Sequence, residues 1–220
     1  HTSGVFRGVA AVIAVLTAYN VLNIETGRTG YLQVIGVSFI FVVLTFSRLQ
    51  AAILALVAAF GFVAAYISLD QFNARVDQTL ANVERMMVND DYQSSAGYRL
   101  EFYRGAIQIG ADNPVGGVGV GDVVAELENR AKSGQIRIVT DNVHSEFMNM
   151  LMAGGVPALL LFSAFVMLIA WVGFQYRKFD RAVGDALTGI SVIVFVSALF
   201  NSTIKDYGEK HALLIMLSLL

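Results

Sequence analysis

Arginines and a histidine are concentrated in two polar segments of an otherwise apolar chain. Residues 98–121 contain Arg99 and Arg104, and residues 141–148 contain His144. A guanidinium group can bind phosphate oxygens through two parallel hydrogen bonds. An imidazole exchanges protons near neutral pH. These residue types together predict chemistry on a charged, phosphate-bearing substrate.

The overall composition is that of a membrane protein. The chain has 220 residues, of which 56% are hydrophobic and 15% charged, whereas a soluble domain averages roughly a quarter charged. It contains no cysteine, which excludes thiolate catalysis, cysteine-bound zinc and disulfides. The net charge of -2 lacks the basic excess of a nucleic-acid-binding protein, so we expect no nucleic-acid partner.

Six apolar runs without strand-like alternation predict an all-α, polytopic transmembrane helix bundle, since only helices or closed barrels span lipid. Residues 1–69 would contribute three transmembrane helices, and residues 156–220 two more with the start of a third. Residues 70–155 would form a large, mostly helical loop outside the bilayer. We expect the chain to be part of a larger membrane protein. The runs are Phe6–Asn23, Tyr31–Phe46, Ala51–Leu69, Val156–Gln175, Gly184–Phe200 and Ala212–Leu220.

The short loops predict the orientation, because basic residues are enriched on the cytoplasmic side. Residues 176–182 contain three basic side chains, and Arg48 lies in the turn between the second and third runs. Placing both turns in the cytoplasm brings residues 25–30, 70–155 and 202–211 together on the opposite face. We therefore expect a multi-pass protein of the bacterial inner membrane whose active site faces the periplasm.

Three helices are predicted within the periplasmic loop. The first is amphipathic and suits the membrane interface, the second carries Arg99 and Tyr103 on one face, and the third carries His144 on a face with apolar neighbours. Asp141 or Asn142 could cap the third helix. Residues 125–139 give no indication of function. The three predicted helices are Gln71–Met87, Gly97–Ile109 and Asn142–Ala153.

Three arginines are candidates for binding the substrate. Arg28 lies between glycines and threonines at the outer end of the second run, where it could bind phosphate or reach the lipid headgroups. Arg99 lies on an otherwise apolar helix face, where a charge needs a partner. Arg104 could equally be a solvated surface charge.

The glycine run 116–121 and His144 complete the candidate site. Gly117 and Gly119 could expose backbone N–H groups to an anion, or could form a tight turn. His144 could take the proton from a sugar hydroxyl as general base, or could be a core residue. No zinc-ligand spacing surrounds it, and no cofactor is expected. The combination predicts glycosyl transfer from a lipid-linked pyrophosphate donor.

Four motifs in the same order resemble those of the O-antigen ligase and polymerase superfamily of bacterial envelopes. They are Thr26-Gly-Arg-Thr-Gly30, the Arg99–Gly121 block with its Asn113-Pro114 pair, His144-Ser-Glu-Phe-Met followed by Ala153-Gly-Gly-Val-Pro-Ala-Leu, and Phe200-Asn-Ser-Thr. Ser145 and Met148 stand where that family usually has asparagine and leucine.

The resemblance implies a membrane fold similar to that of lipid-donor glycosyltransferases and a metal-independent reaction. By it, Arg28 and Arg99 would bind the pyrophosphate of an undecaprenyl-linked glycan and His144 would be catalytic. The resemblance leaves two functions as hypotheses: ligation of the glycan to lipid A-core, and polymerisation of repeat units by the same donor chemistry. A transporter or channel is a third hypothesis of a different class, because it would explain charged residues in a membrane protein. The charges lie at one membrane face and not at mid-depth, which makes transport the weakest of the three.

Overall fold

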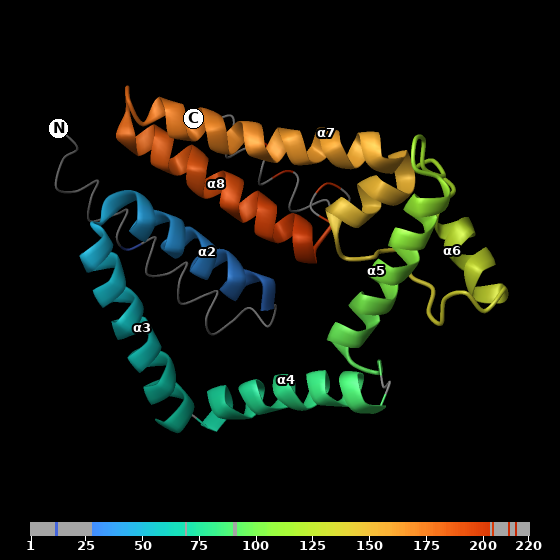
Figure 1. The fold of residues 1–220 in the computed structure, drawn as a ribbon, viewed down its shortest axis with the longest axis horizontal. Coiled ribbons are helices and arrows are strands. Elements are labelled where there is room, and N and C mark those ends of the chain that lie inside the picture. The colour runs from blue at the N-terminus through green and yellow to red at the C-terminus, as the bar shows by residue number, and fades with distance from the viewer. Residues whose placement is uncertain are drawn as a thin grey trace.

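The computed structural model describes residues 12, 28–68, 70–89, 92–202, 204, 211 and 214 (Figure 1). These residues form helices and loops, with no strand among them, which confirms the predicted all-α class. Most of the predicted runs Phe6–Asn23 and Ala212–Leu220 lies outside this part of the chain. The helices are α2 (Arg28–Thr45), α3 (Arg48–Ser68), α4 (Asp70–Asn89), α5 (Ser95–Asp112), α6 (Val123–Lys132), α7 (Glu146–Tyr176) and α8 (Arg181–Phe200).

Three of the described helices are long and apolar enough to cross a membrane: α3, α7 and α8. A shorter apolar stretch, Leu32–Thr45, makes up most of α2. The amphipathic α4 matches the first helix predicted in the loop, and α5 matches the second. In Figure 1, α3 and α4 stand apart from the group formed by α2, α7 and α8, and α4 leads back to the start of α5.

Helix α8 packs between α2 and α7, and both neighbours run antiparallel to it (Figure 1). Small residues allow the close approach, as is common between membrane helices. A Cβ atom on Gly173 would lie 2.7 Å from the backbone nitrogen of Thr188, and one on Gly36 would lie 3.0 Å from the Val192 side chain. The helices are therefore held in fixed register, which sets where the end of α8 lies.

The basic turn between α7 and α8 is tied to the end of α2. Arg177 donates from Nη2 to the carbonyl oxygen of Leu44 at 3.0 Å. Its Nε lies 2.6 Å from Oδ1 of Asp185, a close charge contact that is not aligned as a hydrogen bond. This contact links the turn between α7 and α8 to the end of α2, just before the turn that contains Arg48. These are the two turns that the charge pattern assigns to one face of the membrane.

Helix α7 contains a sharp break. Gly155 has φ 68° and ψ -162°, and Pro157 follows two residues later. Proline has no N–H group and clashes with the carbonyl four residues earlier, so Ala153 loses its partner within the helix. The first part of α7, up to Gly155, therefore turns away from the long part that packs on α8 (Figure 1).

The loop after α5 closes this break with three backbone hydrogen bonds. Val118 N donates to Met152 O at 2.8 Å, Gly119 N donates to Ala153 O at 3.0 Å, and Val156 N donates to Pro114 O at 2.7 Å. The backbone groups freed by the break are thereby satisfied, as buried backbone requires. The break and the glycine run form one unit.

A compact core holds α5, α6 and the first part of α7 together. Its buried members are Ala106, Ile109, Leu127, Ile136, Val143 and Met152. The region 125–139, which the sequence left without a role, thus contains most of α6 and supplies Leu127 and Ile136 to this core. Residues from α5, α6 and the loop before α7 are packed as one body around the start of α7.

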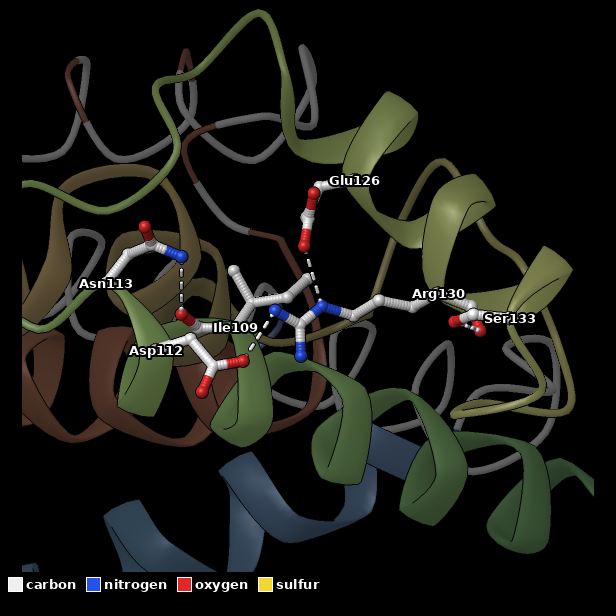
Figure 2. A network of polar contacts seen from close by, with 6 residues as sticks. All are labelled: Ile109, Asp112, Asn113, Glu126, Arg130 and Ser133. Carbon is white, nitrogen blue, oxygen red and sulfur yellow. Dashed lines mark hydrogen bonds and ion pairs between the residues drawn. The ribbon is translucent and has the colours of Figure 1, made fainter.

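An arginine network fixes α6 against the end of α5 (Figure 2). Arg130 is buried, and its Nε lies 2.8 Å from Glu126 while its Nη2 lies 2.7 Å from Asp112. Burial acts to lower the pKa of Arg130, but the hydrogen bonds and charges of Asp112 and Glu126 outweigh it and the pKa is raised. The guanidinium therefore stays charged and joins the two helices.

Candidate functional site

Three segments that are distant in sequence meet at the C-terminal end of α8. Tyr103 on α5 donates its hydroxyl to the carbonyl oxygen of Leu199 at 2.7 Å and lies 3.3 Å from that of His144. Ser145 donates to Ala198 O at 3.1 Å. The polar segments at 98–121 and 141–148 are therefore both joined to the end of α8.

His144 lies in the loop before α7 and not on a helix. The predicted helix Asn142–Ala153 is wrong at its start: α7 begins at Glu146, with Ser145 as its N-cap. The shared face of His144 with Phe147, Met148 and Leu151 is therefore not formed. The physical reason is local, because polar side chains here bind the backbone N–H groups that a helix would need.

The backbone of His144 is strained and held on both sides. Its φ of 51° is the sole positive value among the described non-glycine residues, a conformation that costs roughly 1–2 kcal/mol. Its N–H donates to Oδ1 of Asn142 at 2.9 Å, and its carbonyl faces Tyr103. Within the described residues, no hydrogen bond or ion pair engages the imidazole, which is half-buried. Strain of this kind often accompanies function.

Asn142 connects this loop to the end of α8. Its Oδ1 also accepts from the Ser202 hydroxyl, and Ser202 Oγ accepts from Asn149 Nδ2 at 2.9 Å. Glu146, which is buried, accepts from Ile204 N at 3.0 Å through Oε2. The position of His144 is thus coupled to Ser202 and Ile204.

Arg99 lies one helical turn before Tyr103 and is half-buried. Burial raises the pKa of Tyr103, while the charge of Arg99 and the nearby Ser145 hydroxyl act to lower it. The phenol therefore stays protonated and keeps donating at neutral pH. Within the described part of the chain, no hydrogen bond or ion pair of Arg99 is found.

Arg28 is the first residue of α2. Five residues further on, Gln33 donates to Ser197 Oγ at 3.1 Å. Since a helix rises about 1.5 Å per residue, the backbone of Arg28 lies roughly 7.5 Å beyond that contact, toward the end of α8 where Tyr103 and His144 meet. The structure thus brings Arg28 to the same end of the bundle as Arg99 and His144.

Arg104 is placed differently from Arg99. Its side chain is 59% exposed and lies 3.8 Å from Glu101, whose carboxylate is buried. Among the described residues, no contact links Arg104 to His144. Its observed partner is a carboxylate of its own helix, and its predicted part in substrate binding stays a prediction.

Gly117 and Gly119 both have positive φ, 60° and 86°. Their N–H groups donate to Asn113 O and Ala153 O, each at 3.0 Å. A Cβ on Gly117 would lie 2.4 Å from Met152 O. The N–H groups of Gly117 and Gly119, which an anion nest would need, are therefore already bonded to backbone carbonyls. These contacts are those of a tight turn, the alternative that the sequence left open. Their part in binding substrate stays a prediction.

Two residues at this site were not assigned a role from the sequence. Tyr103 was noted only as a neighbour of Arg99, and Ser202 only as part of a motif. The signal for Ser145 as a cap was present, because a serine directly before Glu146 and an apolar run is typical of a helix start. Tyr103 contacts Leu199, 96 residues away in sequence, and Ser202 contacts Asn142, 60 residues away. Local sequence patterns do not predict contacts between residues so far apart.

The fold and site define a helical membrane protein with an arginine- and histidine-bearing polar site at one end of its bundle. The family model described as O-Antigen ligase matches residues 12–163, more than half of the chain, and the chain belongs to this family. No curated protein matches it. Membership makes it a membrane glycosyltransferase of the ligase and polymerase type, which acts on a lipid-linked glycan.

Proposed function

We propose that the protein transfers a glycan from undecaprenyl pyrophosphate to a sugar hydroxyl of lipid A-core at the periplasmic face of the inner membrane. His144 is the catalytic residue, and Arg28 and Arg99 bind the donor's pyrophosphate. The observation that carries this proposal is the placement of His144. Its strained backbone is clamped by Asn142 and Tyr103, while its imidazole has no protein partner among the described residues.

The reaction begins at the acceptor hydroxyl. The neutral His144 imidazole takes the hydroxyl proton as the oxygen forms a bond to the anomeric carbon of the donor sugar. The bond between that carbon and the phosphate oxygen breaks, and undecaprenyl pyrophosphate leaves with the electron pair. The proton on His144 then passes to solvent, which returns the imidazole to its neutral form.

The arginines act on the leaving group. Negative charge on the phosphate oxygens grows in the transition state, and fixed cations that face it lower the barrier. Arg99 is suited to this because it is half-buried, one turn from Tyr103, and not neutralised by a described carboxylate. Arg104 is given no part in this step, because its exposed guanidinium lies 3.8 Å from the buried carboxylate of Glu101.

The acceptor decides between ligation and polymerisation. The same donor chemistry would join repeat units if the attacking hydroxyl came from a second lipid-linked glycan. The core formed by α5, α6 and the start of α7 borders the site and is the first place where an acceptor could be recognised. We propose the ligase function and treat chain growth on the lipid carrier as the competing outcome.

The test is a transfer assay with the intact protein in bilayers, supplied with undecaprenyl-pyrophosphate glycan and lipid A-core. Wild type should form a joined product, and His144→Ala and His144→Gly should not. Glycine adopts positive φ at no steric cost, so the glycine variant should unfold at a temperature no lower than the alanine variant. Loss of transfer in a well-folded glycine variant would then reflect the missing imidazole. Product formation by either variant would contradict the catalytic role.

Two further arms of the assay test the rest of the proposal. Longer glycan on the lipid carrier without a joined product would identify a polymerase. EDTA should leave the rate unchanged, since the proposed step uses arginines where other transferases use a metal ion. A loss of activity in EDTA that Mg²⁺ or Mn²⁺ restores would contradict the metal-independent mechanism.

A further inference from the structure

The loop between α5 and α6 has an apolar and uncharged tip. The stretch Val115–Gly121, called the valine tip below, contains only valine and glycine. Val115 is 79% exposed and Val120 is 87% exposed. Val118 between them packs on the core instead. Two of the three valines therefore lie on the surface, although the third valine of the same loop reaches the core.

The position of the tip is fixed by its bonds to α7. Pro114, Val118 and Gly119 make the three hydrogen bonds that close the break at Gly155. A Cβ on Gly155 would lie 2.4 Å from Pro114 O, so the two backbones are in direct contact. The tip cannot move away from the break without exposing these backbone groups.

The break is also where the apolar surface of α7 begins. From Val156 to Phe174 the helix contains no charged residue. Val156, Leu160 and Leu161 are all exposed, as expected for side chains that face lipid. Pro114, directly before the valine tip, accepts a hydrogen bond from Val156 N, and the tip itself is bonded to Met152 O and Ala153 O. The tip therefore lies next to the point where the exposed apolar surface of α7 begins.

We propose that the valine tip inserts into the bilayer, with Val115 and Val120 among the acyl chains at the edge of the leaflet. Burial of a valine side chain in an apolar medium is favourable. The backbone N–H groups of Gly117, Val118 and Gly119 are paired within the protein. Among the described residues, the backbone at Val115 and Val120 has no such bonds, so the insertion is shallow: the side chains enter the acyl region while this backbone stays at the level of water and headgroups. The tip thereby fixes the depth of the body formed by α5, α6 and the start of α7.

The chain has a single tryptophan, Trp171, so a fluorescent reporter can be placed at the tip. In a Trp171→Phe background, Val120→Trp and Val115→Trp are compared with Lys132→Trp at the exposed end of α6. Each intact protein is reconstituted in vesicles of plain phosphatidylcholine or of phosphatidylcholine brominated on its acyl chains. The two tip reporters should emit at shorter wavelength than the Lys132 reporter and should lose emission in the brominated lipid.

Quenching by bromine requires contact with the acyl chain, so it separates insertion in lipid from burial against protein. Tip reporters that emit like the Lys132 reporter, with equal emission in both lipids, would overturn the proposal. Blue-shifted emission without quenching would overturn it as well, since the tip would then be covered by protein. Because no glycan transfer is measured, the outcome is independent of the proposed function.

Discussion

At the scale of single residues, the site is organised by contacts that Tyr103 and Asn142 make to the backbone of His144. Neither residue needs to touch the substrate. Both hold a backbone conformation that histidine rarely adopts unaided. Tyr103 and Asn142 are therefore positioning residues for His144, the side chain proposed to be catalytic.

Tyr103→Phe should lower kcat while leaving KM nearly unchanged. The variant removes a hydroxyl that faces His144 O and Leu199 O, and an unsatisfied buried carbonyl costs about 1–3 kcal/mol. The matched control is Tyr98→Phe on the same helix, where the ring is exposed. Steady-state kinetics of the two variants decide the matter. Equal kcat in both would mean that Tyr103 supports the fold without positioning His144.

Arg99→Lys and Arg104→Lys should differ in their use of donor, although both keep the charge. Lysine cannot bind phosphate oxygens with a planar fork. At Arg99 the loss of one charge-assisted hydrogen bond, about 1.5 kcal/mol, should weaken donor use by roughly tenfold. Arg104 is exposed and its pair with Glu101 is 3.8 Å long, so its variant should match wild type. Donor titrations that give the same apparent affinity for both variants would remove Arg99 from the pyrophosphate site.

The same residues illustrate how far the sequence alone could lead. The residue types alone identified Arg99 and His144 as candidates, because charged or ionisable groups beside apolar segments require a partner or a ligand. The sequence did not reveal that His144 lies outside the helix. Thr140, Asn142 and Ser145 each bind local backbone, and this competition overrides the apolar periodicity that predicted a helix from Asn142.

At the scale of elements, the break in α7 and the loop after α5 act as one unit. Helix periodicity predicted the second loop helix well, since α5 runs from Ser95 to Asp112. Sequence could indicate a helix end at Gly155 and Pro157. It could not indicate that Pro114 and Gly119, some forty residues earlier, supply the missing hydrogen bonds, because that pairing depends on the tertiary packing.

Gly117→Ala should destabilise the protein far more than Gly116→Ala. At Gly117 the new methyl would meet Met152 O at 2.4 Å with φ at 60°, whereas at Gly116 it meets nothing within 4 Å. Left-handed backbone costs an alanine about 1–2 kcal/mol, and overpacking adds a similar amount. Thermal unfolding in detergent should show a clear loss of midpoint temperature for the first variant alone. Equal midpoints would mean that the loop does not need to pack on the break.

At the scale of the whole molecule, the charge pattern and the packing agree on which ends belong together. Arg177 joins the α7–α8 turn to the end of α2, and Gln33 joins the start of α2 to the end of α8. Hydropathy anticipated the helices because lipid imposes a length and a composition on each span. The packing of α6 on the end of α5 rests on contacts between residues of different helices, such as Arg130 with Asp112 (Figure 2), and was not predicted.

The orientation in the membrane can be tested directly because the chain has no cysteine. Lys178→Cys lies in the basic turn between α7 and α8, and Lys132→Cys lies at the exposed end of α6. If the basic turn is cytoplasmic, a membrane-impermeant maleimide added to spheroplasts should label Lys132→Cys at once. It should label Lys178→Cys only after the membrane is permeabilised. The reverse pattern would place the site of His144 in the cytoplasm, where a periplasmic acceptor could not reach it. Labelling of both variants in sealed spheroplasts would show that the two ends are not separated by a bilayer.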